Sequence, residues 1–308
     1  MSARLQHQVA TPRIAEPRVK PRPAGKSAFE ELCRTVEGYL SKASDARKRL
    51  LDGPYDAKLL HAWRVSLRRV TATLKDIATL SDDDLGDVLD YLRHCREATG
   101  SCRDLDILVQ ETLPGFINQA GSKRNDHGAV QQHLLEQQQR AHRQAMAALR
   151  KHSLVVPLRA WRRWVDTLEP PSDKAVRKAA AAAIEQRYVT LKKRAEKLDG
   201  GQKRLHRLRS AAKKLRYSIE LYQHAFPKHT ASTWLKPLAE LQTHLGLAHD
   251  RMMARRMFGE LVATEHAQGL TKPFRRWSKR TGYVAAEQAM HALTALDDLE
   301  PYWRSRAH

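Results

Sequence analysis

Two segments of the chain carry cationic side chains at helical spacing. The first set is His61, Arg64, Arg68 and Lys75, and the second is His206, Arg209, Lys213 and Arg216. Because an α-helix turns once in 3.6 residues, these intervals place each set on one helix face. Arginine binds phosphate oxygens through two parallel N–H donors, lysine adds a point charge, and histidine adds a donor that titrates near neutral pH. We therefore expect each face to bind an anion.

Each cationic face lies beside an apolar face that indicates a buried helix side. The apolar residues are Leu60, Trp63, Leu67, Val70, Leu74 and Ile77, then Leu205, Leu208, Ala212, Leu215, Ile219 and Tyr222. Like charges four residues apart destabilise a helix by roughly 0.2–0.5 kcal/mol per pair, and no acidic residue lies between Asp56 and Asp76 or between Gly200 and Glu220. Carboxylates on other helices could neutralise the two faces, or solvent could screen them. The repetition of the pattern together with histidine favours an anion-binding surface.

The segments between helix-breaking residues are predicted to be helical. Ser27 and Glu30 form a capping box that starts a helix running to about residue 51. Gly53 and Pro54 end it, and the next helix is expected over about 55–79. Further starts are expected at Ser81, Ser101 and Ser172, and further breaks near Gly100, Pro114, Pro157, Pro170, Pro171, Gly200, Gly201, Pro227 and Gly269. No segment alternates with period two, so the fold class is all-α.

An internal repeat divides the chain. Residues 61–69 match residues 206–214 at an offset of 145, and residues 100–104 match residues 246–250 at an offset of 146. Two similar helical halves are expected, 28–170 and 171–300. Residues 1–27 are basic and proline-rich, which predicts a disordered tail, and residues 301–308 are expected to form a C-terminal tail.

The composition restricts the classes of function. The 308 residues carry 55 Lys and Arg against 34 Asp and Glu, a formal net charge of +21, which indicates an anionic partner. Cys33, Cys95 and Cys102 form no CxxC or Cys/His zinc spacing, so a reducing compartment is expected. No segment is apolar enough to span a membrane, and residues 1–27 lack the apolar core of a secretory signal. We expect a cytoplasmic protein with no cofactor and no metal site.

The two motifs resemble those of the CHAD domain family of histidine-containing α-helical domains. The family signature HxxRxxx(R/K)(R/K)xR is similar to the sets His61, Arg64, Arg68, Arg69 and His206, Arg209, Lys213, Lys214, Arg216, Tyr217. An accompanying G-x-x-(R/N/H)-D element is similar to the sets Gly100, Arg103, Asp104, Asp106 and Gly246, Asp250. Thr71 stands where the family usually has a third arginine, equivalent to Arg216, so the first half is expected to bind more weakly unless Lys75 compensates.

This resemblance covers about residues 28–300. It implies two pseudo-symmetric helical bundles whose basic faces meet at a central groove or pore that binds inorganic polyphosphate, often on granules. A chain of phosphates has no base edges to read and needs only a closely spaced cationic track. Secondary candidates for that track, also at helical spacing, are Arg140, Arg143, Arg187, Arg194 and Lys197.

Two other classes of function, an enzyme and a nucleic-acid-binding protein, fit the sequence less well. An enzyme is disfavoured because the chain has no ExExK, P-loop or HExxH motif, and because Asp104 and Asp106, two residues apart on a helix, point away from each other. A non-specific nucleic-acid-binding protein is the alternative, since phosphate contacts dominate affinity for any polyanion. Aromatic residues make up only 6% of the chain, and Trp63, Trp161 and Trp164 fall at core positions, which disfavours base stacking. Protein partners are not predicted.

Overall fold

The protein is all-α, as its sequence predicts. The computed structural model describes residues 27–80, 85–120, 127–198, 201–227, 229–262 and 268–305, and within these ranges the chain forms helices and no strands. The N-terminal helices are α1 (Ala28–Asp52), α2 (Ala57–Ile77), α3 (Gly86–Glu97), α4 (Gly100–Ile107), α5 (Leu113–Ala120), α6 (His127–Lys151) and α7 (Val155–Thr167). The C-terminal helices are α8 (Asp173–Glu196), α9 (Gln202–Tyr222), α10 (Thr230–Leu261) and α11 (Gln268–Thr294). Short turns are η1 (Ala78–Leu80), the π-helical η2 (Leu108–Thr112), η3 (Gln223–Ala225) and η5 (Tyr302–Arg304).

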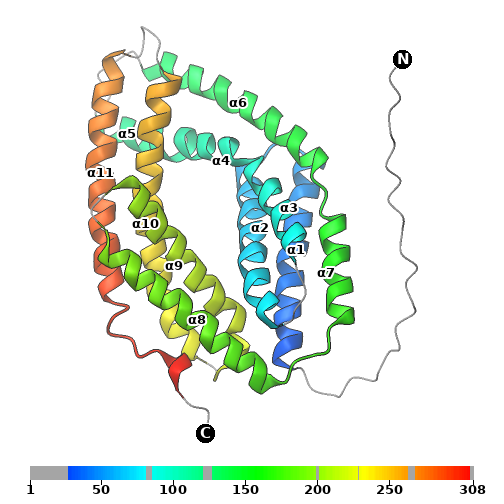
Figure 1. Ribbon diagram of the computed structural model, residues 1–308. Coiled ribbons are helices and arrows are strands. Elements are labelled where there is room, and N and C mark those ends of the chain that lie inside the picture. The colour runs from blue at the N-terminus through cyan, green and yellow to red at the C-terminus, as the bar shows by residue number, and fades with distance from the viewer. Residues whose placement is uncertain are drawn as a thin grey trace, which may run out of the picture.

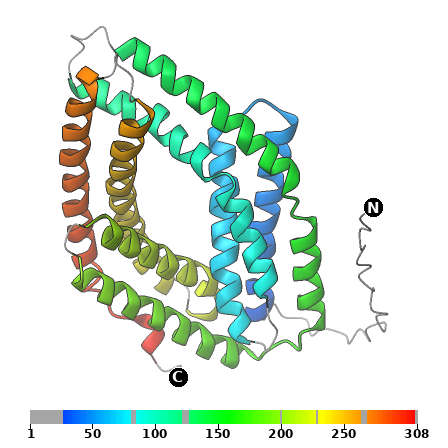
Figure 2. The ribbon, with the colours of Figure 1, turned by 45° about the horizontal axis from the view of Figure 1, so that its top comes forward.

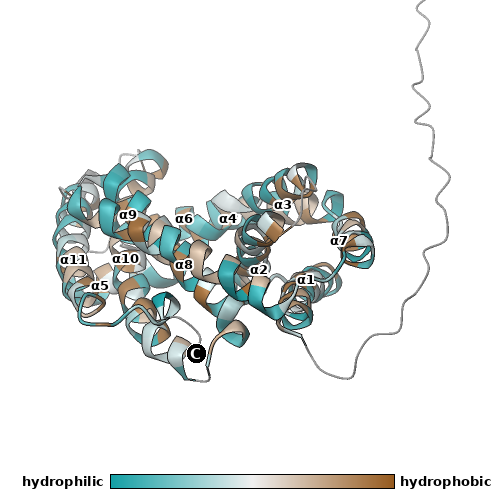
Figure 3. Cartoon of the chain, turned by 60° about the horizontal axis from the view of Figure 1, so that its bottom comes forward, coloured by the Kyte–Doolittle hydropathy of each residue, from teal (hydrophilic) through white to brown (hydrophobic). Residues whose placement is uncertain are grey.

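The helices form two groups that α4 and α6 connect (Figure 1). One group contains α1, α2, α3 and α7, and the other contains α8 to α11 with α5 beside α11. In a second view, α6 runs from beside the start of α11 to the start of α7 (Figure 2). Hydropathy alternates around most helices, with one hydrophobic and one hydrophilic side (Figure 3). The two groups meet where α2 contacts α9, and these are the two helices that carry the cationic motifs.

The first helix of each half starts in the same way. The hydroxyl of Ser27 and that of Ser172 each accept from the backbone N–H three residues on, at 3.2 and 3.3 Å, which confirms both predicted N-caps. The starts of α1 and α8 are 145 residues apart, and so are those of α2 and α9. The backbone N–H of Ala28 donates to Oδ1 of Asp173 at 2.8 Å. The two helix starts therefore lie against each other.

Several predicted breaks lie inside helices. Pro157 falls in the first turn of α7, where a proline costs little because the N–H groups there lack intrahelical partners. Gly269 is the second residue of α11. Pro114 follows the π-helical turn η2 without ending the helix. The second helix, expected over about 55–79, spans Ala57–Ile77, and Asp56 caps its start. The start predicted at Ser81 and most of the N-terminal tail, residues 1–26, lie outside the described residues.

The C-terminal segment packs on the second group. Trp303 is 3% exposed and donates from Nε1 to Oε2 of Glu185 at 2.7 Å, and Arg304 pairs with the same carboxylate. Residues 301–305, which were expected in a tail, are thereby fixed to α8. None of the helices in the described ranges is long and apolar enough to cross a membrane.

Candidate anion-binding cleft

A cleft of about 430 Å³ lies between α2, α3 and α9. Its lining from α2 is Arg64, Arg68, Thr71, Ala72 and Lys75; from α3, Arg93, Arg96 and Glu97; and from α9, His206, Arg209, Ser210, Lys213, Lys214 and Tyr217. Eight of these residues are Arg or Lys and one is acidic. The two repeated motifs thus face each other across one cleft.

Packing around Arg64 fixes its position in this cleft. Its Nη1 donates to the backbone oxygen of Arg96 and, at 3.1 Å, to the hydroxyl of Thr99. These acceptors belong to the end of α3 and the turn before α4, where backbone carbonyls lack helical partners. Burial, then repulsion from Arg68, lowers the pKa of Arg64 to about 10. The cleft therefore contains a preorganised guanidinium whose charge is only partly compensated.

Lys213 has the most strongly shifted pKa among the lining cations for which a value is resolved. Burial, followed by the charges of Arg209 and Arg68, lowers the pKa of Lys213 to about 6. The carboxylate of Asp250 lies 3.9 Å from Arg209 and offsets only part of this repulsion. A cluster of like charges in a partly desolvated site favours a polyanion, which would restore the protonated form of the lysine.

The two motif histidines differ in position. His206 lines the cleft, and its ring centroid is 5.4 Å from that of His249 on α10; burial and then the charge of His249 lower its pKa. His61 is exposed beside the cleft, and partial desolvation followed by the charges of Arg103 and Arg68 lowers its pKa to about 4. Both rings are therefore neutral donors or acceptors near pH 7, not fixed charges.

Arg69 and Arg216, two predicted site residues, turn away from the cleft toward Glu220. Arg69 lies 3.1 Å from that carboxylate and stacks over Tyr39 and Tyr217, while Arg216 lies 2.8 Å from it. The equivalent positions in the first half are Thr71 and Lys75, offset by 145 from Arg216 and Glu220. Lys75 lines the cleft, whereas Arg216 does not. The threonine at position 71 therefore removes no cation from the cleft lining.

The secondary candidates lie elsewhere. Arg187 on α8 pairs with the buried Asp76 of α2 at 2.6 Å. Arg194 lines a second basic pocket of about 200 Å³ whose other lining residues are Lys197, Arg204 and Arg207. Arg140 and Arg143 are exposed on α6 and line neither pocket.

Sequence reasoning missed the contribution of α3. Arg93 and Arg96 line the cleft, and each also contacts an acid of its own helix, Asp90 at 2.9 Å and Glu97 at 3.6 Å respectively. Their spacing of three residues was the available signal. Since no equivalent pair occurs in a repeated motif, only the packing of α3 against α2 reveals that they join the site.

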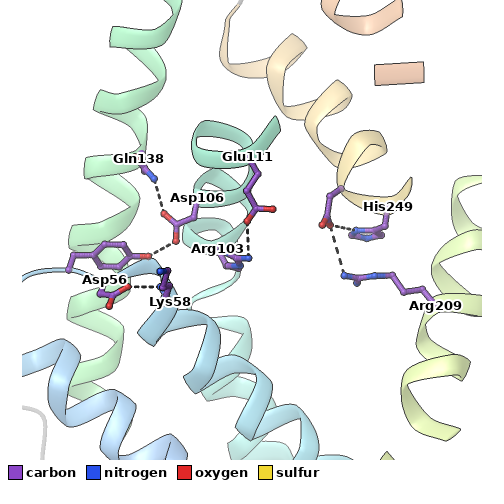
Figure 4. A network of polar contacts seen from close by, with 10 residues as sticks. Asp56, Lys58, Arg103, Asp106, Glu111, Gln138, Arg209 and His249 are labelled. Atoms are coloured by element: carbon purple, nitrogen blue, oxygen red, sulfur yellow. Dashed lines mark hydrogen bonds and ion pairs between the residues drawn. The ribbon is translucent and has the colours of Figure 1, made fainter. Parts of the chain in front are cut away.

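Carboxylates surround the cleft without filling it. Figure 4 shows Arg209 reaching toward the helix of His249, and Arg103 beside Glu111, at 3.4 Å. Burial and then Asp250 raise the pKa of Asp104, which Arg64 and His249 partly oppose. The lining itself holds one carboxylate, Glu97, whose side chain is 61% exposed. Such a lining provides donors and positive charge for an anion.

An all-α fold with a cationic cleft between two helix groups is the architecture to which the comparisons with known proteins apply. Residues 34–259 match the CHAD domain, and the chain belongs to the CHAD domain family. The crystal structure of the CHAD domain from the plant Ricinus communis is similar at a TM-score of 0.74 and 22% identity, covering 89% of this chain and 93% of that one. PptA from Streptomyces chartreusis is similar at a TM-score of 0.57 and 15% identity, covering 90% and 99%. No curated protein sequence matches the chain.

Proposed function

We propose that the cleft binds inorganic polyphosphate and that the protein acts by this binding and not by catalysis. The observation that carries the proposal is the lining: eight Arg or Lys residues from three helices against one carboxylate. Phosphate oxygens accept from guanidinium groups in pairs and from ammonium groups singly, so a chain of phosphates could contact both motifs at once. Membership of the CHAD domain family supports the same ligand.

The type of side chain in the cleft favours polyphosphate over nucleic acid. Binding of single strands relies on exposed aromatic rings on which bases stack. The aromatic residues of the lining are His206 and Tyr217, and Tyr217 is only 6% exposed beneath Arg69. A linear anion without bases needs no such platform, because its charge is its only recognisable feature.

A non-catalytic role is part of the proposal. Metal-assisted hydrolysis of phosphates uses clustered carboxylates to hold the ions. The cleft carboxylate, Glu97, already contacts Arg96, and Asp250 lies beside Arg209. We expect long-chain polyphosphate to survive incubation with the protein and magnesium, and release of orthophosphate would contradict this part. In the cell, the protein would lie in the cytoplasm on polyphosphate granules.

The deciding experiment is a calorimetric titration with long-chain polyphosphate, single-stranded RNA and duplex DNA at equal phosphate concentration. The wild-type protein is compared with a cleft variant, Arg64→Ala/Arg68→Ala/Arg209→Ala, and with a charge-matched control, Arg140→Ala/Arg143→Ala/Arg150→Ala on α6. We expect a preference for polyphosphate that the cleft variant loses and the control keeps, with helicity retained in both. Equal or stronger binding of nucleic acid would establish the alternative function, and undiminished binding by a folded cleft variant would refute the site.

A further inference from the structure

A buried polar cluster lies apart from the cleft, where α4 faces α6. Cys102 and Asp106 are one helical turn apart on α4, and His142 reaches them from α6. The sulfur of Cys102, a carboxylate oxygen of Asp106 and a ring nitrogen of His142 all lie within 4.8 Å of one another. The hydroxyl of Tyr55 contacts the cysteine sulfur at 3.2 Å and donates to Oδ2 of Asp106 at 2.5 Å. Three potential ligand atoms therefore lie together, and a tyrosine hydroxyl contacts two of them.

Asp106 differs from Asp76, the other buried acid of the described residues, in the partners of its carboxylate. The side chain of Asp106 is completely buried, and its partners among the described residues are Tyr55, Gln138 and His142. Figure 4 shows Gln138 reaching it from α6, at 2.9 Å. By contrast, the buried Asp76 has an arginine at 2.6 Å. Among the described residues no Arg or Lys pairs with Asp106, and its ion-pair partner is the imidazole of His142. A buried carboxylate is costly without a cation beside it, so a metal ion here would stabilise it.

We propose that Cys102, Asp106 and His142 bind a divalent transition-metal ion, zinc by preference. A thiolate with an imidazole and a carboxylate is a ligand set suited to zinc and not to magnesium or calcium. Zinc bonds of about 2.0–2.3 Å place tetrahedral ligands about 3.3–3.8 Å apart. The widest separation in the cluster, at most 4.8 Å, has to shorten by up to roughly 1 Å, whereas the 3.0 Å between His142 and Asp106 widens slightly. The fourth position would be taken by the hydroxyl of Tyr55 or by water. The ion would link α4 to α6 and place a cation beside the carboxylate of Asp106.

Two neighbouring side chains, those of Gln138 and Tyr55, orient the carboxylate of Asp106 and the ring of His142. Gln138 donates to the same Oδ1 that contacts Nε2 of His142, at 2.9 and 3.0 Å. The ring of Tyr55 stacks on that of His142 with centroids 3.6 Å apart. Such outer contacts fix the orientation of ligands in metal sites. The imidazole and the carboxylate are therefore held in place before an ion arrives.

The test uses the full chain, freed of metal with EDTA and titrated in the absence of phosphate polymers with zinc and, separately, with cobalt. We expect one ion per chain, a raised Tm with zinc, and a sulfur-to-cobalt charge-transfer band. Cys102→Ser should remove the band and weaken zinc binding at least tenfold, whereas Cys33→Ser should change neither. If Cys102→Ser fails to fold, His142→Gln serves instead, because it should weaken binding at least tenfold and keep the band.

The proposal is overturned if the wild-type protein binds no ion at micromolar zinc, or if the cobalt band survives in Cys102→Ser. The first result would mean that the hydrogen-bond partners of Asp106 satisfy its carboxylate without an ion, and the second that the ion lies elsewhere. The metal-free protein is titrated with polyphosphate in parallel. Since the cluster lies outside the cleft lining, polyphosphate binding tests the proposed function independently of either outcome.

Discussion

Arg187 on α8 donates from Nη2 to Oδ1 of Asp76 on α2 across 2.6 Å, and the hydroxyl of Ser218 on α9 donates to the other oxygen of that carboxylate. The side chain of Asp76 is 5% exposed. Among the described residues, this acid of the first half therefore receives its two side-chain donors from the second half. An arginine that sequence spacing assigns to the ligand track is a structural element of the interface between the halves.

Removal of this arginine should destabilise the fold. Arg187→Ala leaves the carboxylate of Asp76 buried without its cation, which costs about 3–5 kcal/mol. Arg194→Ala, seven residues further along α8, is the control and should change the free energy of unfolding by less than about 0.5 kcal/mol. Denaturant unfolding measures both. Equal stability of the two variants would show that the ion pair contributes nothing.

Binding should depend on pH through Lys213. The pKa of Lys213 in the empty cleft is about 6, whereas a bound polyanion favours the protonated form and raises this pKa. Above pH 6 the protein must take up a proton on binding, so affinity should fall as pH rises, by up to about tenfold per unit. Lys213→Arg should flatten the profile, because arginine stays charged. Calorimetry in buffers of different ionisation enthalpy measures the proton uptake, and none at pH 7.5 would contradict the prediction.

The same lysine should lower the stability of the free protein. Its pKa is below the unfolded value of about 10.5, so the unfolded chain holds more protons between about pH 6 and 10.5. The free energy of unfolding contributed by this group therefore rises with pH over that interval. Lys213→Met should raise Tm at pH 6 by about 2–6 °C, with a gain that shrinks toward pH 10. The control is Lys203→Met on the exposed side of α9, and a gain independent of pH would point to a packing effect.

Glu97 should weaken polyanion binding, because it is the single acid of the lining and partly neutralises Arg96. Glu97→Gln removes that repulsion and should tighten polyphosphate binding about two- to fivefold, the effect of a partly screened charge of ~0.5–1 kcal/mol. The gain should shrink as salt is raised. Glu136→Gln on α6 makes the same change of net charge away from the cleft. A similar gain in both variants would assign the effect to net charge alone.

Chain length should reveal whether the second basic pocket extends the track. Arg194, one of its lining residues, contributes to lowering the pKa of Lys214 in the cleft, after burial, Arg187 and Lys75. The two pockets are thus electrostatically coupled. We expect Arg204→Ala/Arg207→Ala to weaken binding of chains of several hundred phosphates about five- to tenfold and to leave binding of short chains unchanged. An equal loss for short and long chains would show only a general decrease in positive potential.

Much of the fold followed from the sequence. Helical periodicity and the serine caps predicted the all-α class and the starts of α1 and α8, and the resemblance to the CHAD domain family is confirmed. Breaks were predicted less well, because proline is tolerated in the first turn of a helix, as Pro157 shows, and Gly269 also lies at a helix start. Local signals do not distinguish these positions from true helix ends.

The cleft was predicted in part. Spacing placed Arg64, Arg68 and Lys213 on the right faces, since those faces depend on helix geometry alone. Spacing could not reveal which arginines have acidic partners. Arg69 contacts an acid 151 residues away, and Arg187 one that is 111 residues away. Such pairs depend on how the helices pack against each other. The same packing places the two α3 arginines in the cleft lining.

The hydrogen bond from Ala28 to Asp173 joins the start of the first helix to a residue 145 positions further along the chain. This contact can form only when Asp173, the first residue of α8, has left the ribosome. Before then the first half can collapse around its own apolar side chains, as N-terminal units do. It does so with Asp76 still lacking its arginine and Arg69 lacking Glu220. The second half then supplies both partners. Assembly therefore ends with two ion pairs, in which each half provides an arginine to a carboxylate of the other, at the interface where the cleft lies.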